Sequence, residues 1–153
     1  MSSWIDLANA YGSVPHNLIQ FALSWYHIPL FLQELIFNYY ELLKATVTTK
    51  AWTTAFFCFA IGVFQGCPLS AILFDVVFNL LVDFLSTLKH LGYILKATRI
   101  SSFTTAFADD LNITTRSPKG NQTVLDLTDT WLSWTRTMRA KPRKCVSIAF
   151  RQC

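Results

Sequence analysis

Charged residues are scarce in this sequence. Of its 153 residues, only 14% are Asp, Glu, Lys or Arg, whereas 52% are hydrophobic. An ordinary soluble domain carries about 25% charged residues, and disordered segments combine high charge with low hydrophobicity. The composition therefore excludes a disordered chain and indicates apolar surface that other protein segments or a membrane cover. The length suits one compact domain over residues 1–153.

The sequence also lacks a cysteine motif and a signal peptide. Its cysteines, Cys58, Cys67, Cys145 and Cys153, show no CxxC spacing, so we expect reduced thiols in an intracellular protein. The N-terminus has no basic region followed by an apolar core. We expect a location in the nucleus or the cytoplasm, and the sequence does not choose between them.

Acidic residues are missing from the end of the chain. Residues 1–100 hold five basic and five acidic side chains, whereas residues 101–153 hold eight basic and four acidic ones. From Trp131 onward there is no acidic residue and six basic ones occur: Arg136, Arg139, Lys141, Arg143, Lys144 and Arg151. A basic segment of this kind favours a polyanionic partner, and an ordinary solvated face is the alternative.

One uncharged segment is long enough to cross a bilayer. Residues 51–74 carry no charge, but Gln65, Gly66 and Pro68 interrupt them in the middle. A helix broken there would leave unpaired backbone groups in lipid. We therefore expect no membrane, and a span at about 51–82 remains the less favoured alternative.

Hydrophobic periodicity and turn residues predict an alternating order of strands and helices. The segment "WIDLA" favours a strand, and Ser13 and Pro15 mark the start of a helix, with Ser13 as its N-cap. The further expected elements are a helix at 30–43, a hairpin around 50–52, a helix of about five turns after Pro68, strands at 93–100 and 102–115, a helix at 122–138 and a strand at 145–150. This order indicates an α+β domain with a mostly antiparallel sheet backed by helices.

Acidic side chains occur within the expected strands, where desolvation is costly. Asp109 and Asp110 lie in "TTAFADDLNITT", and Asp6 lies in "WIDLA". Three converging carboxylates would repel one another and raise their pKa values, and a divalent cation removes that conflict. Carboxylates on rigid strands suit Mg²⁺, which also takes substrate phosphates as ligands. The alternative is that Asp109 and Asp110 simply form a hairpin turn.

Three motifs in order give these acids a context. The segments "DLANAYGSVPH", "GVFQGCPLSAILF" and "FADD" resemble the palm of a reverse transcriptase, of the type found in non-LTR retrotransposons and group II introns. The resemblance extends from Trp4 to about Phe150. It implies an RNA-directed DNA polymerase palm that uses two Mg²⁺ ions, or Mn²⁺, to transfer a nucleotide from dNTP to a primer 3′-hydroxyl. An RNA template and a DNA primer are the implied partners.

The resemblance assigns roles to individual residues. Asp6, Asp109 and Asp110 are the implied catalytic and metal-binding acids, and Lys144 is the implied acid that protonates the leaving pyrophosphate. The implied nucleotide and template contacts are Tyr11, which excludes a ribose 2′-hydroxyl, Gln65 and Gly66 in the turn before the long helix, and Phe107 in the aromatic position before the acids. For Tyr11 simple packing is the alternative, and for Lys144 an ordinary solvated lysine.

The sequence departs from the family pattern in places. The segments that resemble the family's palm begin at Trp4 and end near Phe150, so fingers and thumb are expected to be missing and the palm incomplete at both ends. Ala71 replaces a usual proline, and Ile61 and Phe64 replace basic or polar residues. A non-catalytic remnant of a retroelement with residual nucleic-acid binding is therefore the second hypothesis. Missing fingers and thumb segments of a larger polyprotein are candidate partners.

Overall fold

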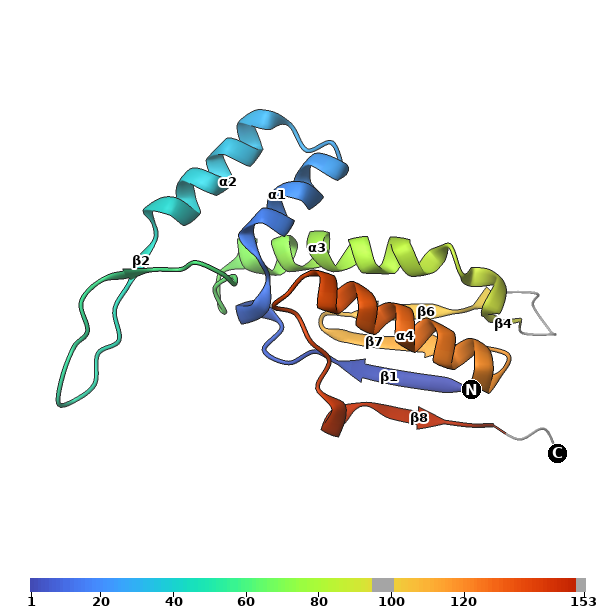
Figure 1. The fold of residues 1–153 in the computed structure, drawn as a ribbon. Helices are drawn as coiled ribbons and strands as arrows, with labels where there is room; N and C mark the ends of the chain where they lie inside the picture. The colour runs from blue at the N-terminus through green and yellow to red at the C-terminus, as the bar shows by residue number, and fades with distance from the viewer. Residues whose placement is uncertain (95–100, 151–153) are drawn as a thin grey trace.

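The fold is built on a four-stranded antiparallel sheet with strand order β6-β7-β1-β8 (Figure 1). It is seen in a computed structural model that describes residues 1–94 and 101–150. The strands are β1 (Ser2–Asp6), β6 (Thr104–Phe107), β7 (Asp110–Thr114) and β8 (Val146–Ile148). The N-terminal strand thus lies in the interior of the sheet between strands from the C-terminal half.

Two long helices, α3 (Pro68–Ser86) and α4 (Pro118–Trp134), pack against one face of this sheet. The strand residues of that face are buried, including Ile5 of β1 and Leu111 and Ile113 of β7. Side chains alternate along a strand, so Trp4 and Asp6 lie on the opposite face, together with Asp110 and Asn112. That second face is open, and Trp4 is 42% exposed on it.

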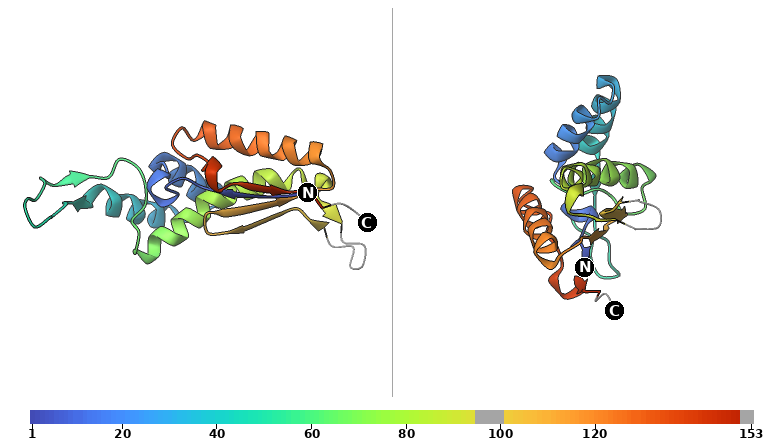
Figure 2. Two further views of the ribbon diagram at one scale, coloured as in Figure 1. Left: turned by 90° about the horizontal axis from the view of Figure 1, so that it is seen from below. Right: turned by 90° about the vertical axis from the view of Figure 1, so that its right-hand side faces the viewer.

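A second pair of helices, α1 (His16–Trp25) and α2 (Leu30–Leu42), extends beyond the end of the sheet where β1 finishes (Figures 1 and 2). The apolar residues on one face of α1 are buried: Leu18, Ile19, Ala22 and Leu23. Between α2 and α3 the chain forms a projecting hairpin with short strands β2 (Lys44–Ala45) and β3 (Phe57–Cys58).

Short elements complete the described chain. They are the 3₁₀ helices η1 (Tyr11–Ser13), η2 (Lys89–Leu91) and η3 (Pro142–Lys144), and the paired strands β4 (Tyr93–Ile94) and β5 (Ser101–Ser102). Most of the predicted strand at 93–100 lies outside the described residues. The predicted α+β class, the antiparallel sheet and the helical layer behind it are confirmed.

Two local predictions are wrong. Ser13 is not an N-cap: it ends η1 and donates its hydroxyl to the Ala10 carbonyl, and Pro15 occupies the cap position of α1. The helix expected at 122–138 begins earlier, at Pro118, because the Ser117 hydroxyl accepts the Gly120 N–H and caps it. Both serines lie shortly before a proline, but only Ser117 caps a helix.

Residues 51–82, the alternative membrane span, do not form one continuous helix in the structure. Residues 51–67 form a strand and turns, and only α3 is long and apolar enough among the described residues to cross a bilayer. Of the most apolar window of α3, 44% is buried inside the protein. Its inward side chains Phe74, Val77 and Leu81 are fully buried in the core. The helix is therefore explained by its packing against the sheet.

Candidate active site

Two acidic side chains face each other across the open side of the sheet. Asp6 ends β1, and its Cα partner in the β1–β7 register is Asp110, the first residue of β7. Residues directly opposite in an antiparallel pair place their side chains on the same face. Asp6 keeps 19% of its side chain exposed, and Asp110 is exposed. The two carboxylates thus share an accessible surface.

The third predicted acid, Asp109, lies in the turn that precedes Asp110. Phe107 pairs with Asp110, so Ala108 and Asp109 form a two-residue hairpin turn. Ala108 adopts φ 50°, which is uncommon for a residue other than glycine and occurs in tight hairpin turns. Among the described residues, no three acidic, His or Cys side chains come close enough together to hold a metal ion. The structure therefore brings Asp6 to Asp110, with Asp109 adjacent in the chain.

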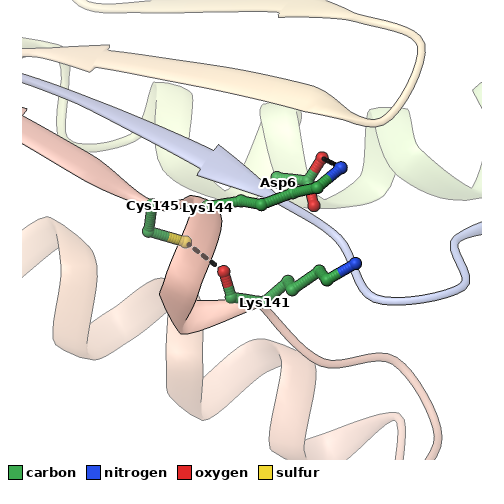
Figure 3. Close-up of polar contacts among 4 residues, drawn as sticks. All are labelled: Asp6, Lys141, Lys144 and Cys145. Carbon is green, nitrogen blue, oxygen red and sulfur yellow. Dashed lines mark hydrogen bonds and ion pairs between the residues drawn. The ribbon is translucent and has the colours of Figure 1, made fainter.

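A basic segment lies against the end of β1. The Lys141 N–H donates to the Asp6 carbonyl at 2.8 Å, and the Ala8 N–H donates to the Arg139 carbonyl at 2.8 Å. These bonds hold η3 beside Asp6 (Figure 3). From there the Lys144 ammonium reaches the Asp6 carboxylate at an Nζ–Oδ1 distance of 3.5 Å. Because Lys144 is 57% exposed, this ion pair contributes little to stability and leaves the ammonium available to a ligand.

Lys141 is a neighbour that the sequence motifs did not single out. Its side chain extends in the same direction as that of Lys144, from the turn that η3 forms (Figure 3). The Cys145 thiol donates to the Lys141 carbonyl at 3.4 Å and closes that turn. The charge imbalance after Trp131 includes Lys141 and points to this segment, although it assigns this lysine no individual role.

The other predicted nucleotide-contacting residues lie around this end of the sheet. Tyr11 is in η1, soon after Asp6, and its ring stacks on Phe74 of α3 at a centroid distance of 5.1 Å. Phe107 is 84% exposed at the end of β6. Gln65 and Gly66 are exposed in the turn before α3, where Gly66 has φ 88°. That left-handed conformation favours glycine.

The thiol of Cys67 lies at the start of α3, directly after this turn. The Ser70 N–H at the first turn of the helix is the main cause that lowers the pKa of this thiol, and Leu69 N–H and the Tyr39 hydroxyl act in the same direction. Burial opposes them and raises it. Thiolates are stabilised at helix N-termini in this way. Sequence reasoning missed this residue because it expected the thiols to be buried among apolar residues, and that expectation is wrong for Cys58, which is exposed, and for Cys67, which is half-buried.

Cys67 is expected to react with iodoacetamide faster than Cys58 near neutral pH. The thiolate is the reacting form, and a lowered pKa keeps that form populated to lower pH. Cys58 is an exposed internal control, in β3 rather than at a helix start. Alkylation of each cysteine is followed by mass spectrometry between pH 6 and 9. Equal rates for the two thiols at every pH would contradict the expectation.

The arrangement suits a magnesium ion in its donor chemistry. Mg²⁺ binds through one or two carboxylates and completes its shell with water and substrate phosphates. Asp6 and Asp110 supply two oxygen donors on rigid neighbouring strands, and the open face leaves room for a phosphorylated ligand. Lys144 already balances the Asp6 charge, as expected where carboxylates lie close together.

An antiparallel sheet with helices on one face and an acid pair on the other is consistent with a reverse transcriptase domain. The chain belongs to the reverse transcriptase family: the family model described as "Reverse transcriptase (RNA-dependent DNA polymerase)" matches residues 1–151. The resemblance inferred from the three motifs is thereby confirmed.

Three curated relatives are retrovirus-related Pol polyproteins of retrotransposable elements. The chain is 30% identical over 147 residues to one from Drosophila melanogaster, a match that covers 96% of this chain and 13% of the relative. It is 29% identical over 145 residues to one from Nasonia vitripennis, covering 95% of this chain and 14% of the relative. It is 30% identical over 145 residues to one from Popillia japonica, covering 95% and 23%. The chain thus spans less than a quarter of the length of each relative.

Proposed function

We propose that this chain is the palm portion of an RNA-directed DNA polymerase, which transfers a nucleotide from dNTP to a primer 3′-hydroxyl. The observation that carries the proposal is the placement of Asp6 directly opposite Asp110 on the open face of the sheet, with Asp109 in the adjoining turn. Family membership supplies the reaction class. The open face supplies a surface on which a template and a primer can lie.

Asp6, Asp110 and Asp109 are the residues that would hold Mg²⁺, with Mn²⁺ as a substitute. Two such ions, when bound, activate the attacking hydroxyl and stabilise the leaving pyrophosphate. The chain's own share is to present charged oxygens at fixed positions, because Asp6 and Asp110 belong to hydrogen-bonded strands. Coordination is expected to be weak until the phosphates of dNTP complete the shell.

Lys144 is proposed to donate a proton to the departing pyrophosphate. Its ammonium lies 3.5 Å from the Asp6 carboxylate, so it is next to the acids without being enclosed by them. A general acid has to reach the leaving group within hydrogen-bond distance, and the exposed, long side chain of Lys144 permits that movement.

Tyr11 is proposed to limit the space at the sugar of the nucleotide, and the Gln65–Gly66 turn is proposed to contact the base.

The complete activity is proposed to need further segments. The relatives are Pol polyproteins of which this chain matches 13% and 14%, and fingers and thumb segments would grip the template on both sides of the palm. Several large apolar side chains are exposed on α2 and α3, among them Leu30, Phe31 and Ile72. Such a surface fits coverage by other protein segments. An intracellular location follows for a protein that copies nucleic acid.

Primer extension on an RNA template tests the proposal. The chain is assayed with Mg²⁺ and dNTP, alone and mixed with fingers and thumb segments of a related polyprotein. Extension that requires this chain supports the polymerase assignment. Absence of extension in both mixtures, while the chain still binds RNA, would identify the alternative, a non-catalytic remnant. Ala71, Ile61 and Phe64, which depart from the family pattern, are the observations that favour that alternative.

A further inference from the structure

The hairpin between α2 and α3 projects from the molecule as an arm. The aromatic arm, residues 44–61, begins at β2 and returns through β3, and it extends from the end of the sheet where Asp6 and the β6–β7 turn lie (Figures 1 and 2). Lys44 pairs with Cys58 and Ala45 with Phe57 at its base. The fold of the described core does not require so long a hairpin. The exposed surface of the arm is therefore a candidate for a function of its own.

The tip of the aromatic arm is a defined turn. Thr48 and Thr53 form a bridge, and the Thr49 N–H donates to the Trp52 carbonyl at 2.8 Å. The Thr49 hydroxyl accepts the N–H groups of Ala51 and Trp52 and donates to the Trp52 carbonyl. These bonds fix the backbone of Trp52, so its indole projects from an ordered position.

The base of the aromatic arm is fixed to the candidate site. The Gly62 N–H donates to the Val14 carbonyl and the Val63 N–H to the Tyr11 carbonyl, both at 2.7 Å. Ring contacts continue from the arm into the body, from Phe57 to Phe59, to Phe64 and to Tyr40. The arm therefore leaves the body beside Tyr11 and the turn before α3.

The arm's surface combines exposed rings with positive charge. Trp52 is 56% exposed and Phe56 is 74% exposed. Lys44 and Lys50 lie on the same arm, and no Asp or Glu occurs from residue 42 to residue 74. Aromatic faces stack on unpaired bases irrespective of sequence, and lysines contact the phosphates between them. Threonine hydroxyls, which this arm has in number, also bind phosphate oxygens.

We propose that the aromatic arm binds a single-stranded nucleic acid, with bases stacked on Trp52 and Phe56 and phosphates at Lys44 and Lys50. This inference rests on the proposed function, because it assigns the arm to the strand that reaches the acid site. The absence of carboxylates and the presence of two lysines select a polyanion over an apolar protein surface. A base-paired duplex would not present free base faces to these rings.

The test measures binding of a fluorescently labelled single-stranded RNA to the full chain by anisotropy, without Mg²⁺ or dNTP. Trp52→Ala is expected to weaken the affinity about ten-fold or more, in line with the contribution of one stacked base. Phe56→Ala is expected to act in the same direction. Trp25→Ala is the matched control, because Trp25 is 60% exposed at the end of α1, outside the arm. Thermal unfolding confirms that each variant folds.

Several outcomes would overturn the inference. They are the absence of RNA binding by the unchanged protein at micromolar concentrations, equal losses in Trp52→Ala and Trp25→Ala, and equal affinity for double-stranded RNA. An unchanged RNA affinity combined with loss of self-association in Trp52→Ala would assign the arm to protein contacts instead. Failure of the polymerase proposal is read separately, from nucleotide binding by Asp6 variants. A chain that binds RNA through Trp52 but binds no nucleotide would support the inference about the arm and contradict the polymerase proposal.

Discussion

An Asp6→Asn protein is expected to lose metal-dependent nucleotide binding. Asn keeps the size of the side chain and removes the charge that the proposed metal ligand contributes. Changes to outer partners of a metal already cost about 10–100-fold in affinity, so loss of a direct charged ligand is expected to cost about 100-fold or more. The measurement is titration of Mn²⁺ in the presence of dNTP, followed by electron paramagnetic resonance of the free ion.

The matched control for this experiment is Asp129→Asn. Asp129 is an exposed carboxylate on α4, so its replacement changes the net charge equally without touching the β1–β7 acids. It is expected to bind Mn²⁺ and dNTP as the unchanged protein does. Asp110→Asn is expected to behave like Asp6→Asn, because the two residues are register partners. Equal Mn²⁺ binding by all of these proteins would end the proposal that the acid pair is a metal site.

The acid site shows what the sequence could predict. The sequence placed Asp6 and Asp110 in strands, and the register of β1 and β7 places both on one face of the sheet. The structure places Asp109 in a hairpin turn with Ala108, and Asp110 at the first position of β7. The turn and the proposed metal site are compatible, because the turn lies at the end of the sheet where the start of β7 pairs with the end of β1. The turn therefore supports the proposed site.

Contacts between distant residues could not be predicted from periodicity. The ion pair of Lys144 with Asp6 joins residues 138 positions apart, and the hydrogen bonds of Gly62 and Val63 tie the arm to η1. Hydrophobic patterns report which side of an element is buried and carry no information on its partner. The family resemblance implied that Lys144 lies near the acids. It did not predict the backbone hydrogen bonds that hold Lys141 beside Asp6.

The Ser13 prediction failed for a related reason. Ser13 precedes an apolar helix and satisfies the local rule for an N-cap. In the structure, the chain between Asp6 and α1 is held instead by contacts with residues after the arm, including the Val14 carbonyl that accepts the Gly62 N–H. His16 also contacts the Gly62 carbonyl through Nε2 at 2.9 Å. These tertiary bonds, rather than a side-chain cap, determine where α1 begins.

Gly62→Ala is expected to destabilise the protein strongly, for two reasons: the backbone conformation at Gly62 favours glycine, and there is no room for a Cβ. Its φ is 87°, and a Cβ there would lie 2.9 Å from the Cα and the carbonyl oxygen of Gly12. The left-handed conformation costs about 1–2 kcal/mol for a residue with a Cβ, and forced overlap costs about 1–3 kcal/mol more. At about 2–4 °C per kcal/mol for a chain of this size, the summed cost lowers the expected melting temperature by roughly 4–20 °C.

Gly66→Ala separates the two causes. Gly66 has nearly the same backbone conformation, with φ 88°, but a Cβ on it would meet no atom within 4 Å. Its replacement is therefore expected to cost only the conformational part, about 1–2 kcal/mol. Both free energies of unfolding are measured by urea titration. If Gly62→Ala costs no more than Gly66→Ala, the contact between Gly62 and Gly12 is not tight in solution, and the arm is not fixed against the segment that carries Tyr11.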